Sequence, residues 1–349
     1  MLLPVKTVPT VQTERLLGID VARAIAFAGM AFAHFAGSST PGDPGWLQAF
    51  DNIADGRAAS LFCMLLGLGA GILSARGTPD RLVVRRGLVL LALGLAIWPV
   101  VDRVFLILPH YGVLLVLVPL LRRIPTPWLL PTAVAAFLVP SAITALVDDH
   151  GMRLAEQPDR YLDLFDPWFL VRHLVWTGGY PLVGWAGFVL VGLWVARQPL
   201  GEPAAQRRLL VGGTAVAALQ PLAAAALSAA GDGRWAEFLD GTAHSNRTAW
   251  YVVASGSAVA AIGLCLILVR RVTPLRALAP LGRLALSAYL LHMLIGIRVW
   301  EWRDTEAPPL ASQMVAAAAV VALLAVGAAL WGRRLSRGPA EAIVRAISG

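Results

Sequence analysis

Charged residues are scarce in this chain. They make up 14% of its 349 residues, whereas hydrophobic residues make up 58% and the mean hydropathy is +0.69. Such a composition excludes an ordinary soluble globular protein. Apolar runs long enough to cross a bilayer of about 30 Å recur along the whole length, so we expect a multi-pass membrane protein with no soluble domain.

Cysteine is also rare, with two residues in all. Cys63 and Cys265 lie inside apolar runs that the topology below places toward opposite leaflets, which excludes a disulfide between them. No Cys/His spacing typical of a metal site is present, so no metal is expected. The first apolar run lacks a convincing cleavage site and contains Asp20 and Arg23, so we interpret it as a retained span rather than a signal peptide.

The apolar runs predict an all-α fold, a helix bundle that forms a single integral-membrane domain over residues 1–349. About ten transmembrane helices are expected, at 17–37, 57–75, 84–101, 104–121, 127–146, 177–196, 208–230, 249–269, 282–299 and 311–331. The flanking segments are a short cytoplasmic lead (1–14), an outer loop with an interfacial amphipathic helix (147–176) and a basic cytoplasmic tail (332–349).

The distribution of charge predicts the orientation of the bundle. With ten spans, most arginines near span ends fall on one side of the membrane and most acidic loop residues fall on the other. Both termini are then cytoplasmic. The net charge of +8 thus reflects topology, with anionic lipid headgroups as its partner, and no nucleic acid is expected.

The first span carries ionisable residues on one helical stripe. Asp20, Arg23 and His34 follow the helical spacing, and Arg23 and His34 lie about 16 Å apart at helical rise. Lipid-exposed charge is costly, so we expect these side chains to face a shared polar chamber inside the bundle. The alternatives are an ion pair of Asp20 with Arg23 that only stabilises the helix start, and an interfacial anchor at His34.

Histidines and arginines gather at opposite ends of the predicted bundle. His34, His110 and His244 lie at or near the outer face and His292 near the bilayer middle; histidine takes and returns protons near neutral pH. The inner mouth has Arg23 and Arg283, with Arg85 and Arg86 nearby. Guanidinium groups match phosphate oxygens, which favours a phosphate-headed ligand. Solvated histidines and the positive-inside bias are the alternative explanations.

Several segments in order resemble a known family. They are 15–23 with Gly29, Met30 and His34, then 56–67, 110–112, 179–181 with Trp185, 244–245, and 282–283 with Tyr289 and His292. In their order and spacing they resemble the transmembrane acyltransferase family that includes lysosomal heparan-α-glucosaminide N-acetyltransferase and bacterial relatives.

The resemblance implies acetyl-CoA as the donor, with its phosphates toward the cytoplasm. The acceptor would be an amine or hydroxyl, in a sugar, reached from the other side of a bacterial plasma membrane. The implied donor-binding residues are Asp20, Arg23, Arg57, Arg283, Ser287, Tyr289, His292, Arg85 and Arg86.

The resemblance also implies a catalytic histidine. Relatives carry it in the outer loop after the first span, but this chain has no histidine between Gly37 and Arg57. His34 is the nearest substitute as general base, and His244 or His110 would donate to the developing oxyanion.

Other functional classes stay open at this stage. A small-solute transporter or lipid flippase would show inverted halves with paired broken helices, which the sequence does not indicate. A non-catalytic membrane scaffold would not need matched polar groups on several spans. A homodimer is an open alternative to a monomer.

Overall fold

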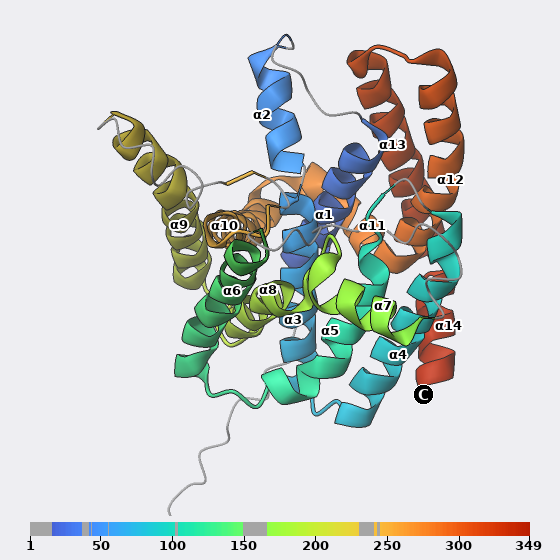
Figure 1. Ribbon diagram of the computed structural model, residues 1–349. Coiled ribbons are helices and arrows are strands. Elements are labelled where there is room, and N and C mark those ends of the chain that lie inside the picture. The colour runs from blue at the N-terminus through green and yellow to red at the C-terminus, as the bar shows by residue number, and fades with distance from the viewer. Residues whose placement is uncertain are drawn as a thin grey trace, which may run out of the picture.

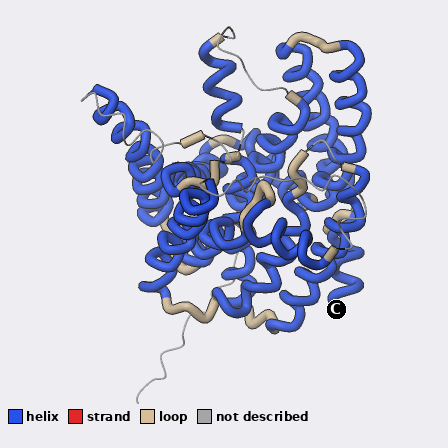
Figure 2. The backbone as a smooth tube through the Cα atoms, viewed as in Figure 1, coloured by secondary structure: helices blue, strands red, loops and turns tan. Residues whose placement is uncertain are grey.

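The computed structural model describes residues 16–36, 42, 44–54, 56–101, 104–148, 166–229, 241–242 and 245–349. In this part of the chain the regular structure is helical and no strand occurs (Figure 2). The helices are α1 (Leu17–Phe35), α2 (Gly45–Ala54), α3 (Arg57–Ala75), α4 (Asp80–Ile97), η1 (Trp98–Val100), α5 (Ile107–Leu121), α6 (Thr126–Asp148), α7 (Pro167–Arg172), η3 (His173–Thr177), α8 (Leu182–Ala196), α9 (Pro203–Ala229), α10 (Thr248–Arg271), η5 (Thr273–Leu278), α11 (Ala279–Arg283), α12 (Ala285–Glu306), α13 (Leu310–Arg334) and α14 (Pro339–Ser348).

The expected apolar spans each coincide with a helix or with a pair of adjoining helices. Among the described residues, six helices are long and apolar enough to cross a membrane: α1, α3, α4 with η1, α9, α10 and α13. A seventh is added if the bent pair Thr273–Arg283 and Ala285–Glu306 counts as one span. Shorter apolar stretches lie in α5, α6 and α8. An all-α, multi-pass architecture is therefore confirmed, while ten spans and their orientation stay predictions.

Two flanking segments fall partly or wholly outside the described residues. The lead, 1–14, lies outside entirely, as does the stretch 149–165 of the expected outer loop. The rest of that loop forms α7, whose N-cap Asp166 accepts a hydrogen bond from the Trp168 amide at 2.9 Å, and the π-helical turn η3.

Helix α1 lies at the centre of the bundle (Figure 1). It packs against α3, α10, α11, α12 and α13. Small residues permit this: a Cβ placed on Gly18 would lie 2.7 Å from the Cα of Leu266 in α10. Close backbone approach at glycine is a common way for membrane helices to associate.

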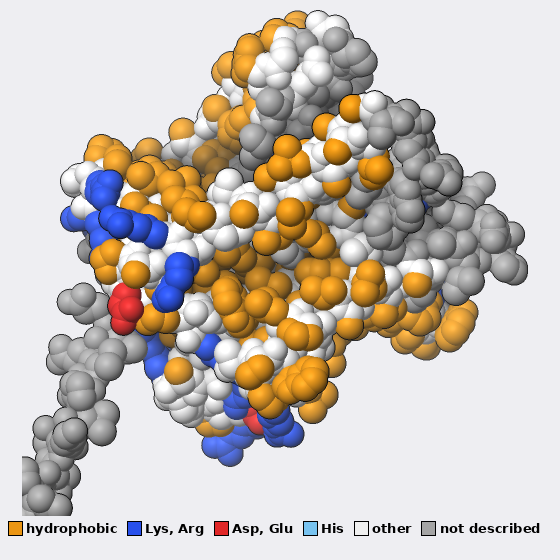
Figure 3. All heavy atoms as spheres, turned by 90° about the vertical axis from the view of Figure 1, so that its left-hand side faces the viewer, with side chains coloured by type: hydrophobic (Ala, Val, Ile, Leu, Met, Phe, Trp, Pro, Cys, Tyr) orange, Lys and Arg blue, Asp and Glu red, His pale blue; other side chains and the backbone are white. Residues whose placement is uncertain are grey.

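The outside of the bundle is apolar. Figure 3 shows one face covered largely by hydrophobic side chains, with arginines gathered toward its borders. The exposed residues include Val211, Leu219 and Leu222 of α9 and Leu323, Val326 and Leu330 of α13. Exposed apolar area of this extent is what a lipid-facing surface requires.

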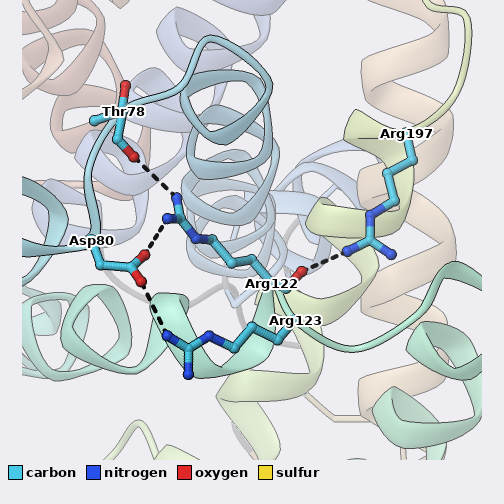
Figure 4. A network of polar contacts seen from close by, with 5 residues as sticks. All are labelled: Thr78, Asp80, Arg122, Arg123 and Arg197. Atoms are coloured by element: carbon cyan, nitrogen blue, oxygen red, sulfur yellow. Dashed lines mark hydrogen bonds and ion pairs between the residues drawn. The ribbon is translucent and has the colours of Figure 1, made fainter.

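Arginine side chains form ion pairs and hydrogen bonds between three helix junctions at one end of the bundle (Figure 4). Asp80, at the start of α4, pairs with Arg122 and, at 3.3 Å, with Arg123 at the end of α5. Arg197, after α8, donates to the carbonyls of Arg122 at 2.9 Å and Ile124 at 2.8 Å. Its guanidinium thus satisfies carbonyls that a helix end leaves without partners.

We expect Arg197→Ala to lower the free energy of unfolding by about 1 kcal/mol, because a charged donor to two main-chain carbonyls is lost at an exposed position. Thermal unfolding of the detergent-solubilised protein measures this. Arg207→Ala, a nearby substitution on α9, is the control and should leave the midpoint unchanged. Equal midpoints of thermal unfolding in the wild type and the two variants would contradict the stabilising role of Arg197.

Candidate active site

A cavity of about 210 Å³ lies among α1, α3, α4, α5, α11, α12 and α14. Its lining combines apolar side chains with two arginines, two tyrosines and one carboxylate: Arg23, Phe62, Leu65, Leu90, Ile107, Leu108, Tyr111, Gly282, Arg283, Ala285, Leu286, Tyr289 and Glu341. An apolar cavity with a few convergent polar groups is the usual form of a small-molecule site.

Arg23 and Asp20 form an ion pair on α1. Nη1 of Arg23 lies 3.0 Å from Oδ1 of Asp20, and the two side chains are 28% and 2% exposed. The arginine lines the cavity and the carboxylate is buried behind it. The pair is therefore a local i, i+3 contact whose cation lines the cavity, and the role of the two residues stays a prediction.

The helix that supplies Arg283 breaks beside this cavity. Segments Thr273–Arg283 and Ala285–Glu306 meet at an angle of 78°. Gly282 permits the break to sit against α1, because a Cβ there would overlap the carbonyl oxygen of Asp20. Nε of Arg283 is buried and has no hydrogen-bond partner among the described residues. The break in this span therefore places the guanidinium group of Arg283 at the cavity, which Arg23 also lines.

Aromatic residues line the middle of the cavity. The Phe62 ring lies 5.1 Å from that of Tyr111 and 6.5 Å from that of Tyr289. Tyr289 is 1% exposed. The backbone of Ile107 approaches its hydroxyl, but no described group reaches hydrogen-bonding geometry with it. A buried hydroxyl without a partner is costly, which makes Tyr289 a candidate donor to a ligand.

Two histidines meet beyond Tyr289. Nδ1 of His34, on α1, lies 3.0 Å from Nε2 of His292, on α12, and the rings stack with centroids 5.3 Å apart. Nδ1 of His292 contacts the carbonyl of Tyr289. Because a carbonyl only accepts, that nitrogen carries the proton, and Nε2 of the neutral ring accepts from His34. Neutral His34 then keeps its basic lone pair on Nε2.

Surrounding aromatic residues hold this histidine pair. The rings of Phe27 and Phe35 stand edge-on to His292, at 5.2 and 5.7 Å. Nε1–H of Trp300 donates to the carbonyl of His34 at 2.8 Å, which fixes the end of α1 against α12. His292 is fully buried and His34 is half-buried, so His34 is the member of the pair that faces outward.

The cavity and the histidine pair are adjacent rather than continuous. Arg23 lines the cavity, but His34 does not, although both lie on α1. Tyr289 separates them, with its ring 5.0 Å from that of His292. Arg23 and His34 therefore do not line one shared cavity, as the sequence led us to expect; Tyr289 lines the cavity and contacts His292.

The other expected site residues lie elsewhere. His110 is buried with Trp98, His173 and Tyr180, its ring 5.8 Å from His173 and 5.5 Å from Tyr180; this group does not include His34. Arg57 begins α3. Ser287 lies beside the cavity and contacts Glu341. Arg85 and Arg86 lie on α4, which packs against α14. His244 is outside the described residues.

Glu341 belongs to the site although the sequence reasoning treated 332–349 as a basic tail. The pattern Gly338-Pro339-Ala340-Glu341 indicates a helix start, since proline at the first helical position and an acid in the first turn are typical there, but no local pattern reports the contact of Glu341 with α12. Within the described residues no group of three His, Cys, Asp or Glu side chains could hold a metal ion.

Comparison with known families gives two matches. The family model described as heparan-alpha-glucosaminide N-acetyltransferase, catalytic, matches residues 15–228, more than half of the chain. The chain belongs to this family. A second model, described as a protein of unknown function (DUF418), matches residues 194–348. A comparison with curated proteins finds no match.

The family match and the apolar helices together make the chain an integral membrane protein of the heparan-alpha-glucosaminide N-acetyltransferase family. The two matches divide the site between them. Arg23 and His34 lie in the first matched region, and Arg283, Tyr289, His292 and Glu341 lie in the second. The cavity and the histidine pair are thus assembled from both matched regions.

Proposed function

We propose that the chain is a membrane acyltransferase that moves an acetyl or other short acyl group from acyl-CoA to an amine or hydroxyl of a sugar. One observation supports this most directly: the hydrogen-bonded pair of His34 and His292 lies one side chain away from a cavity lined by two arginines, in a member of an acetyltransferase family.

The donor would bind through the cavity. Arg23 and Arg283 would hold phosphate oxygens, and the Tyr289 hydroxyl would donate to a polar group of the pantetheine arm. The apolar lining from Phe62, Leu65 and Leu108 suits the rest of that arm and excludes water. In the orientation predicted from the arginines, this end of the site faces the cytoplasm.

The acceptor would meet the acyl group at the histidine pair. Nε2 of His34 would take the proton from the attacking amine or hydroxyl as the new bond to the acyl carbon forms and the C–S bond breaks; the thiolate leaves and takes up a proton. His292 stabilises the charged form of His34 because its Nε2 accepts from Nδ1–H of His34. The half-buried position of His34 allows approach from the outer side.

Binding of CoA tests this proposal. We expect CoA to raise the thermal midpoint of the purified protein, and Arg283→Ala to weaken CoA binding about tenfold, because one charge-assisted phosphate contact is lost. Arg333→Ala is the control: it removes an arginine at the end of α13 that does not line the cavity. Equal CoA affinity in all three proteins would contradict the phosphate role of Arg283.

A transporter is the second candidate, and one observation favours it. The 78° break between Thr273–Arg283 and Ala285–Glu306 resembles the discontinuous helices of secondary transporters. Transporters of that kind carry such helices in pairs, and the described residues contain one such bent pair. A protein that CoA does not stabilise, but that moves solute into proteoliposomes, would favour this reading.

A further inference from the structure

Helices α12 and α14 meet at their N-termini. Neither N-cap residue, Leu284 or Gly338, provides a side-chain hydrogen bond to its own helix. Instead the Glu341 carboxylate accepts from the amides of Leu286 at 2.9 Å and Ser287 at 3.2 Å. Oγ of Ser287 accepts from the Ala340 amide at 3.1 Å and donates to Glu341. Each helix therefore caps the other across the joint.

This joint is an anion-binding position that a carboxylate already fills. Helix N-termini carry roughly half a positive charge each, and amides at such ends bind phosphates well. Glu341 lies in the lining of the cavity together with Arg23 and Arg283. With Asp20 paired to Arg23, the two acids balance the two arginines. Removal of Glu341 would leave an excess of positive charge at the cavity.

Two further features of the cavity bear on what it can bind. The Tyr289 hydroxyl is buried, lines the cavity and has no hydrogen-bond partner among the described groups. The volume of about 210 Å³ is below the range of roughly 300–1,000 Å³ typical of small-molecule sites. A whole acyl-CoA therefore needs more room than the cavity has while Glu341 is in place.

Helix α14 is suited to leave this position. It is a ten-residue helix that buries Ala340, Val344 and Ser348 while Ile343 and Ile347 stay exposed. Arg345 lies close enough to Arg86 of α4 for their charges to repel. A short helix with few buried side chains opens at low cost compared with the core of a fold.

We propose that α14 is a displaceable plug of the donor site: Glu341 occupies the position of a donor phosphate and leaves it when acyl-CoA binds. The inference rests on the proposed function, because it takes the cavity as the donor site. The contact between α14 and α12 would then regulate the site, since any interaction that holds α14 against α12 lowers the affinity for the donor.

Two variants release the plug in different ways. Glu341→Gln removes the charge. Gly338→Ala displaces the two side chains that make the joint, because a Cβ there would overlap Oε2 of Glu341 and Oγ of Ser287, and the φ of −74° at this position suits alanine. Gly327→Ala, in α13, is the control, since a Cβ there meets nothing within 4 Å.

We expect Glu341→Gln and Gly338→Ala to bind CoA about tenfold more tightly than wild type, as the fraction of binding-competent protein rises. Isothermal titration in detergent measures this. Gly327→Ala should match wild type. Pantetheine lacks the phosphates of CoA. Because Glu341 is proposed to compete only with phosphate, pantetheine should bind wild type and the three variants equally.

A spin label provides a second measurement that needs no change at the joint. Ile347→Cys places it on the exposed side of α14, and the native cysteines, Cys63 and Cys265, are buried. We expect saturating CoA to increase the mobility of the label.

The outcomes separate the two proposals. If wild type binds CoA, but neither variant binds it more tightly and the label stays immobile, Glu341 is a structural cap; the plug is then wrong and the proposed function stands. If CoA binds neither wild type nor the variants, the donor site is wrong and the plug with it.

Discussion

His34→Ala is expected to lower acyl transfer at least about a hundredfold, because a positioned general base contributes on the order of 10² to 10⁴ to such reactions. CoA affinity should stay within about threefold of wild type, since His34 does not line the cavity. His292→Ala should also lower transfer, because His34 loses the partner 3.0 Å from its Nδ1. Release of CoA thiol from acetyl-CoA, assayed with a panel of amino sugars, measures both.

The control for this experiment is His173→Ala. His173 is also buried, but it packs with Trp98 and His110 and not with the histidine pair. The His173→Ala variant should retain acyl transfer provided that it folds. Thermal unfolding shows whether it does. Full transfer by His34→Ala would exclude His34 as the general base.

Gly282→Ala is expected to destabilise the protein by about 3 kcal/mol, the upper end of the usual cost of overpacking. A Cβ at this position would overlap the carbonyl oxygen of Asp20 and lie 3.1 Å from the amide nitrogen of Ala24. Backbone atoms cannot rotate away as a side chain can, so α11 would have to separate from α1. The separation would also move Arg283 and weaken CoA binding.

Gly327→Ala is the matched control, an identical substitution in an open position of α13. It should unfold at the same temperature as wild type or slightly higher, because alanine favours a helix over glycine. Equal unfolding temperatures of the Gly282 and Gly327 variants would show that α1 and α11 are not in tight contact.

The helices were largely predictable because hydropathy dominates this sequence. The expected span 17–37 is observed as Leu17–Phe35, and 57–75 as Arg57–Ala75. Helix α12 continues to Glu306, past the expected end at 299, because its last turns are polar and hydropathy does not report them. Helix α2 was missed because Pro and Gly flank it in a segment that was expected to be an outer loop.

Arg23, Arg283 and Tyr289, which line the cavity, were among the residues singled out from the sequence, but Glu341 was not, and the grouping of these residues could not be predicted. Helical spacing placed Asp20 and Arg23 on one face, and they form a pair. His34 and His292 are 258 positions apart, and no local pattern reports a contact across that separation. Likewise, Glu341 acts on amides of a different helix. The spacing of residues along one helix predicts which of them share a face, whereas contacts between helices depend on how the whole bundle packs.

The position of Glu341 also affects when the site can form during synthesis. The cavity draws its lining from α1, the first described helix, and from α14, whose last residue is Ser348. The ribosome must therefore synthesise α14 before the lining of the cavity is complete. Until then, the amides at the start of α12 lack the Glu341 carboxylate, whereas Arg23 already has Asp20 on its own helix.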